Sequence, residues 1–111
     1  MTAPALERDL VQECRTVAKA MNVMLCEVGQ YKAKSSGTTT GFPDLVAIVA
    51  GRVVLIETKR AKGGVLSIGQ EAFIARAAEQ NVHVFVVDRV EDFVSIANGC
   101  RRPTRQTPTT D

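Results

Sequence analysis

Two short apolar runs joined by a glycine-containing turn constrain the fold of this chain more than any other feature. The runs extend from Leu45 to Ala50 and from Val53 to Ile56, are rich in Val and Ile, and meet at Ala50-Gly51. Apolar runs of this length, bounded by turn residues, predict two β-strands joined as a hairpin. Because the runs are almost wholly apolar, they predict strands that are buried on both faces of a sheet.

The length of the turn determines which residues face each other across the hairpin. With a two-residue turn at Ala50-Gly51, Val49 lies opposite Arg52 and Asp44 lies opposite Glu57. Directly opposed residues share a face of the sheet, with Cβ atoms about 4.5–5.5 Å apart. Ala-Gly is a weaker turn signal than Asn-Gly, and a three-residue loop would shift the register. The hairpin therefore predicts two carboxylates side by side.

Two carboxylates at this separation repel each other unless a cation lies between them, so removal of one acid is expected to stabilise the metal-free protein. Mg²⁺ prefers oxygen ligands and commonly takes one or two carboxylates together with water and phosphate. Lys59 shares the face of Glu57 and could orient a water molecule, whereas Thr58 points away. Two acids and a lysine around a metal are the parts needed to hydrolyse a phosphodiester. The alternative is a salt bridge between Lys59 and one acid on a solvated face.

An acidic residue lies on the apolar face of the first predicted helix, residues 4–22. Apolar side chains recur at helical spacing through this range, and Glu7 falls within their arc, whereas Glu13 falls just outside it. A Glu in the first turn also complements the helix dipole, so the residues alone leave the role of Glu7 open.

The segment Ser67-Ile68-Gly69-Gln70 begins a predicted helix of residues 68–80 and fits a capping box, in which Gln70 reaches back to the Ser67 amide. Gln70 also shares a helix face with Phe73 and Ala77, and this face is expected to pack on the sheet. The sequence leaves two interpretations open, since Gln70 could cap the helix or point towards the two carboxylates.

The remaining elements are a strand at 23–28, a strand at 82–87 and a helix at 90–98 that ends at Gly99. The order α-β-β-β-α-β-α predicts an α/β fold in one domain. Residues 100–111 are rich in Arg, Thr and Pro, and predict a basic, disordered tail. Segments 82–87 and 90–98 are more apolar than a small core requires, so they could form an interface or ordinary core.

Composition excludes several classes of function. No apolar run approaches the roughly 20 residues of a membrane span. Three widely spaced cysteines without a CxxC motif indicate a reducing cytoplasm and argue against disulfides or a zinc site. The net charge is +2, and without residues 101–111 the chain carries equal numbers of acidic and basic residues. Contacts with nucleic acid would therefore have to come from local clusters.

Three motifs occur together: Gly41-Phe42-Pro43-Asp44, Ile56-Glu57-Thr58-Lys59 and Ser67-x-x-Gln70. Their order and spacing resemble the VRR-NUC (virus-type replication-repair nuclease) family, in its small stand-alone form, within the PD-(D/E)XK nuclease superfamily. The resemblance covers roughly residues 5–98. It implies a nuclease domain over 1–99 with a restriction-endonuclease-like α-βββ-α-β core, in which helices flank a mixed sheet.

The resemblance also implies a metal-dependent DNA endonuclease of phages or bacteria that uses Mg²⁺, with Mn²⁺ as a substitute, and no organic cofactor. Lys59 would position the attacking water and Gln70 would support it. The implied metal ligands are the carboxylates of Asp44 and Glu57, the backbone carbonyl of Thr58, and Glu7, with Glu13 as the alternative to Glu7.

The resemblance to the stand-alone members of the family further implies a homodimer that cuts branched DNA, including four-way (Holliday) junctions. A nickase or a flap-type nuclease of the same fold is an alternative, as is a non-catalytic DNA-binding module. A polar loop at 29–41 and the segment after Lys59 carry the basic side chains expected to bind phosphate, which are Lys32, Lys34, Arg60 and Lys62.

Overall fold

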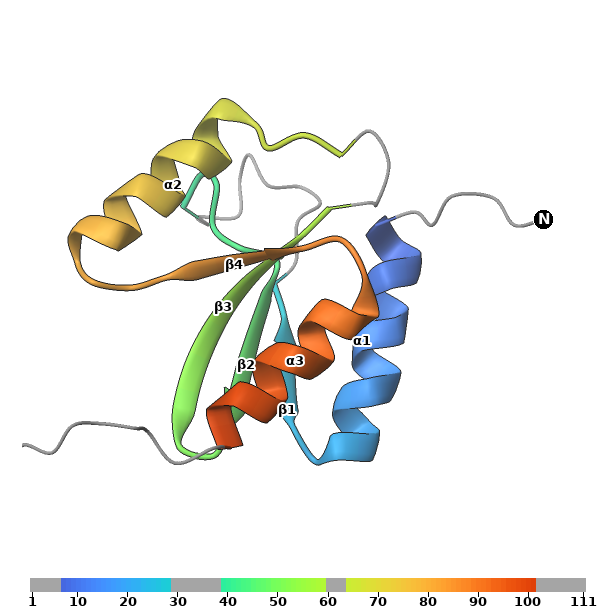
Figure 1. Cartoon of the computed structure of the whole chain (residues 1–111). Coiled ribbons are helices and arrows are strands. Elements are labelled where there is room, and N and C mark those ends of the chain that lie inside the picture. Colours follow the sequence, from blue (N-terminus) through green and yellow to red (C-terminus); the bar gives the residue numbers. More distant parts are fainter. Residues whose placement is uncertain (1–6, 29–38, 60–63, 102–111) are drawn as a thin grey trace, which may run out of the picture.

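A computed structural model describes residues 7–28, 39–59 and 64–101, apart from the side chains of Glu7 and Arg8. The order of the elements along the chain confirms the predicted α/β fold (Figure 1). The elements are α1 (Glu7–Met21), β1 (Met24–Glu27), β2 (Leu45–Val49), β3 (Arg52–Thr58), α2 (Ile68–Glu79), β4 (Val84–Val87) and α3 (Val90–Arg101).

The four strands form one mixed sheet in the order β1-β2-β3-β4, in which only β3 and β4 are parallel. The predicted hairpin register is confirmed, because Val49 pairs with Arg52 and Leu45 pairs with Ile56. The turn residues Ala50 and Gly51 both have positive φ, 53° and 79°. Two successive positive φ values are typical of the type I′ turn, whose twist matches that of the strands.

The core lies between the sheet and the helices α1 and α3, which cover one face together (Figure 1). Alternation along β2 directs Leu45, Ala47 and Val49 into this core, where they are buried. The helices supply side chains at helical spacing, which include Leu10, Cys14 and Ala18 from α1 and Phe93 and Ala97 from α3.

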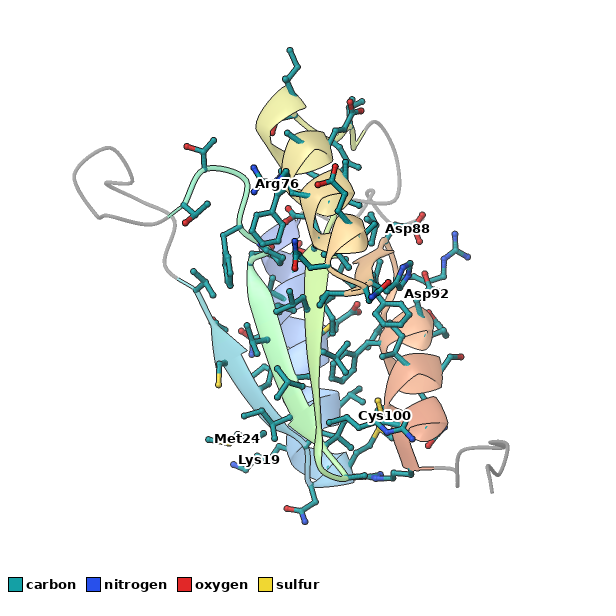
Figure 2. The ribbon with its side chains drawn as sticks, turned by 90° about the vertical axis from the view of Figure 1, so that its left-hand side faces the viewer. Lys19, Met24, Arg76, Asp88, Asp92 and Cys100 are labelled. Atoms are coloured by element: carbon teal, nitrogen blue, oxygen red, sulfur yellow. The ribbon has the colours of Figure 1, made fainter. Side chains whose placement is uncertain are left out.

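The other face of the sheet is covered only in part, so the expectation of strands buried on both faces is wrong. Helix α2 packs against β4, where Val84 is 3% exposed. Below α2 the face turned towards the viewer in Figure 2 has no helix over it. We call this region the open sheet face, and its most exposed apolar residues are Met24 (62%), Ile48 (38%), Val53 (67%) and Val86 (45%).

Helix α3 continues through Gly99 to Arg101, so the expected end at Gly99 is wrong. Tertiary contacts hold the last turn, because Cys100 packs against the core and the Arg101 guanidinium donates a hydrogen bond to the carbonyl of Met21. Cys100 and Arg101, which were expected in the tail, thus belong to α3, and residues 102–111 lie outside the described part. No helix within the described ranges is long and apolar enough to cross a membrane.

Candidate functional site

The three sequence motifs meet at one end of the sheet. Asp44 immediately precedes β2, and Glu57 and Thr58 end β3, so the antiparallel pairing of the hairpin brings them together. The first turn of α2 and the start of α1 lie at this same end (Figure 1). Residues far apart in the sequence are thus gathered around the end of β3.

Asp44 is held by Thr58. The backbone N–H of Thr58 donates to Oδ1 of Asp44 at 3.0 Å, and the Thr58 hydroxyl donates to Oδ2. The Asp44 carbonyl accepts a hydrogen bond from the amide of Val28 at 2.9 Å. Thr58 was expected to contribute only its backbone carbonyl, but its fully buried side chain orients the carboxylate as well.

Glu57 is a buried acid that accepts a hydrogen bond from Gln70 and lies beside the ammonium group of Lys59. It is 3% exposed, and its Oε2 accepts a hydrogen bond from Nε2 of Gln70 at 2.6 Å. Nζ of Lys59 lies 4.0 Å from the same oxygen. The ion pair between Lys59 and an acid, which the sequence left open as an alternative, is present, but it is largely buried and not on a solvated face, since the Lys59 side chain is only 14% exposed.

Gln70 satisfies both interpretations left open by the sequence. The Ser67 hydroxyl accepts a hydrogen bond from the backbone N–H of Gln70 at 3.1 Å. The backbone N–H of Ser67 donates to the side-chain oxygen Oε1 of Gln70 at 2.8 Å, which completes the capping box. The other end of the side-chain amide donates to Glu57. Because the cap occupies the oxygen, the amide nitrogen is directed at the carboxylate.

Lys59 continues the sheet beyond the end of β3. Its backbone amide donates to the carbonyl of Val87 at 2.9 Å, which extends the parallel pairing with β4 by one hydrogen bond. This bond holds the backbone of Lys59 and directs its side chain to the same face as Glu57.

Helix α1 lies close enough to the site for the charge of Asp44 to contribute to the pKa of Cys14. Burial raises the pKa of the Cys14 thiol to about 11, with further contributions from the charges of Glu13 and Asp44. Glu13 itself is exposed, as its place at the margin of the apolar arc predicts. Glu7 begins α1, but its side chain lies outside the described part.

Among the described side chains, no three His, Cys, Asp or Glu residues form a group that could hold a metal ion. Two carboxylates are present at the site, and the third expected acid, Glu7, is not among the described side chains. The basic residues expected to bind DNA also lie outside the described ranges, and these are Lys32, Lys34, Arg60 and Lys62.

Sequence reasoning missed two contacts that shape the site. The hydroxyl of Thr58 was not expected to bind Asp44, although a polar residue at the end of an apolar strand was a signal for it. The rings of Phe42 and Phe73 pack edge to face with centroids 5.3 Å apart, and they join the corner before β2 to α2. No local pattern pairs these two residues.

Solved structures that are similar to this chain in fold include two VRR_NUC domains. One is described as a VRR_NUC domain protein, with a TM-score of 0.69, 18% identity, and coverage of 86% of this chain and 88% of the other. The second is described as a VRR_NUC domain, with a TM-score of 0.67, 19% identity, and coverage of 85% of this chain and 97% of the other. No family model and no curated protein matches the sequence. The chain therefore has the VRR-NUC fold, as the motifs predicted.

Proposed function

We propose that this protein is a metal-dependent nuclease that hydrolyses phosphodiester bonds in DNA. The observation that carries the proposal is the cluster formed by Asp44, Glu57, Lys59 and Gln70 at one end of a sheet with the VRR-NUC fold. A buried acid beside a lysine, next to a second acid that is held by two hydrogen bonds, is a costly arrangement for a purely structural end of a sheet.

The donors at the site fit a hard divalent cation. Asp44 and Glu57 offer carboxylate oxygens, Thr58 offers a backbone carbonyl, and Mg²⁺ and Mn²⁺ prefer oxygen ligands. Hydrogen bonds from Thr58 and Gln70 orient the two carboxylates, as the surrounding shell of a metal site commonly does. Glu7 is the proposed third acid, and Glu13 is its alternative on the same helix.

A bound cation would lower the pKa of a water molecule and reduce the charge on the phosphate. The protein side chains have separate roles in our proposal. Lys59, with its ammonium group near Oε2 of Glu57, orients the attacking water and stabilises negative charge on the phosphate. Gln70 keeps Glu57 in one orientation through its amide nitrogen. The products are a 5′-phosphate and a 3′-hydroxyl.

The proposed substrate is branched DNA, with four-way junctions as the preferred form. The basic residues proposed to bind the phosphate backbone are Lys32, Lys34, Arg60 and Lys62. Arg101, at the end of α3, is bound instead to the carbonyl of Met21 at the C-terminal end of α1, away from the site. A nickase or flap-type nuclease with the same site is the alternative.

We propose that the protein acts as a homodimer, because two matched cuts in a junction require two sites in a fixed relation. In the segments 82–87 and 90–98, Val87, Phe93 and Ala97 are buried in the core and are not available for an interface. The open sheet face is a better candidate for the interface. Met24, Ile48 and Val53 are neighbours across three strands and present exposed apolar side chains with no charged residue between them. Such a surface is suited to pack against a second copy of itself.

Sedimentation of two variants, each with one exposed valine replaced by lysine, tests the proposed dimer interface. Val53 is 67% exposed on the open sheet face, and Val65 is 77% exposed outside the sheet. Val53→Lys is expected to shift the protein from dimer to monomer at micromolar concentration, whereas Val65→Lys is expected to remain dimeric. A monomeric wild-type protein, or a dimer that survives Val53→Lys, contradicts this interface.

Cleavage of linear duplex, flap and four-way DNA in Mg²⁺ or Mn²⁺ tests the main proposal. Glu57→Gln is expected to abolish cleavage and retain DNA binding, because an amide keeps the shape of the side chain but lacks the charge that holds the cation. Glu79→Gln, at an exposed position on α2, is the matched control and is expected to cleave as the wild type does. Wild-type activity in Glu57→Gln contradicts the site, and binding without cleavage by the wild type favours a non-catalytic module.

A further inference from the structure

The backbones of Gly41 and Gly69 are in direct contact, and this contact joins the corner before β2 to the first turn of α2. A Cβ atom added to Gly41 would lie 2.1 Å from the carbonyl oxygen of Gly69 and 3.0 Å from the amide nitrogen of Gln70. A Cβ atom added to Gly69 would lie 2.8 Å from Cγ2 of Thr40. A side chain at Gly41 therefore fits only if the backbone of α2 moves, whereas a methyl group at Gly69 requires only the exposed Thr40 side chain to move.

The glycine contact closes a ring of interactions around the site. Each member of the ring is bonded to the next or lies within three residues of it in the sequence. In order, the ring passes through Gly41, Asp44, Thr58, Glu57, Gln70 and Gly69. Helix α2 has no fully buried residue, so few packing contacts compete with this ring in placing its first turn.

We propose that Gly41 and Gly69 are positioning residues whose contact sets the distance between the side-chain amide nitrogen of Gln70 and the carboxylate of Glu57. The capping box determines which end of the amide faces Glu57, and the glycine contact determines how close it comes. The expected effect on cleavage rests on the proposed nuclease function. The expected effect on the hydrogen bond between Gln70 and Glu57 does not.

The size of the effect follows from the contact distances. A methyl group at Gly41 requires the first turn of α2 to retreat by about 1 Å, because it would otherwise lie 2.1 Å from a backbone oxygen. The bond from Gln70 to Glu57, now 2.6 Å, would then lengthen beyond the upper limit of about 3.2 Å for an N–H···O hydrogen bond. A misplacement of about 1 Å in a catalytic site can lower the rate by about 100-fold.

The chain contains a matched control for the backbone conformation of Gly41. Gly41 and Gly51 have φ values of 82° and 79°, but a Cβ on Gly51 would meet no atom within 4 Å. Alanine therefore introduces similar backbone strain at both positions and a clash at only one. We expect Gly41→Ala to reduce cleavage by about 100-fold, and Gly51→Ala to retain the activity of the wild type.

A second pair of variants decides the question if Gly41→Ala does not fold. Gly69 and Gly99 both lie within helices, where alanine is favoured, and a Cβ on Gly99 would meet no atom within 4 Å. We expect Gly99→Ala to retain activity, and Gly69→Ala to lose activity by less than the roughly 100-fold expected for Gly41→Ala, because only the Thr40 side chain has to move. Thr40→Ser removes the Cγ2 atom that clashes, and should restore activity to Gly69→Ala.

Nuclear magnetic resonance of the Gln70 side-chain amide gives a readout that does not depend on cleavage. The resonances of this amide, assigned by their loss in Gln70→Ala, should shift in Gly41→Ala and Gly69→Ala towards their positions in Glu57→Ala, and remain in place in the two control variants. Wild-type resonances in every folded variant at Gly41 or Gly69 would overturn the inference, as would failure of Thr40→Ser to restore Gly69→Ala. Shifted resonances in a protein that never cleaves DNA would leave the inference standing and overturn the nuclease proposal.

Discussion

Replacement of Asp44 by alanine is expected to destabilise the protein even when no metal is bound. Thr58 is fully buried and donates both its backbone N–H and its hydroxyl to the Asp44 carboxylate. Alanine leaves these two donors without that acceptor. The expectation drawn from a pair of repelling acids is the opposite, since removal of one acid would then stabilise the metal-free protein.

The contacts at the site decide between the two expectations. A buried donor left without an acceptor costs about 1–3 kcal/mol, and the lower end applies here because the Asp44 bonds are only partly buried. Two donors then cost about 2 kcal/mol in total. Relief of repulsion offsets little of this, because Lys59 lies 4.0 Å from Glu57 and already screens its charge. For a domain of this size the melting temperature should fall by about 8–16 °C.

Thermal unfolding followed by circular dichroism, in an excess of chelator, measures this change. Asp44→Asn is the matched control, because its oxygen still accepts from the Thr58 amide and its nitrogen can donate to the Thr58 hydroxyl. It should lose cleavage but keep most of the stability. Unchanged or increased stability in Asp44→Ala would refute the reasoning, and equal destabilisation in Asp44→Asn would show that hydrogen bonding to Thr58 is not the cause.

Three further predictions concern the turn, a buried thiol and the helix cap. Ala50→Asn should raise the free energy of unfolding by about 1 kcal/mol in chemical denaturation, because asparagine tolerates the positive φ that strains alanine. At about pH 8, alkylation followed by mass spectrometry should modify exposed Cys26 long before Cys14, because burial raises the pKa of the Cys14 thiol to about 11 and keeps it protonated. Ser67→Ala should lower the free energy of unfolding by about 1 kcal/mol, since the backbone N–H of Gln70 loses the hydroxyl oxygen to which it donates, and Ser67→Thr should restore the stability.

Local patterns in the sequence were sufficient to predict the order of the elements, the hairpin and the motif residues. The spacing of Leu45–Ala50 and Val53–Ile56 around a two-residue turn determined the register, because side chains alternate along a strand and a slip of one residue would reverse every face. The same register brought Asp44 close to the end of β3. The capping box at Ser67 and Gln70 is likewise a contact between residues three apart, which a sequence pattern can reveal.

Contacts between distant segments were decided only by the tertiary structure. The side-chain amide of Gln70 could not be assigned to one partner from the sequence, because its second partner, Glu57, lies 13 residues away in the chain, at the end of β3. The hydroxyl of Thr58 bonds Asp44 since the end of β3 meets the corner before β2. Helix α3 passes through Gly99 because core contacts and a bond to the end of α1 outweigh the low helix propensity of glycine. The apolar runs determined that a sheet would form. They did not determine what would cover it, because a strand pattern shows only which side chains share a face. The placement of α2 over only part of the sheet left the open sheet face exposed.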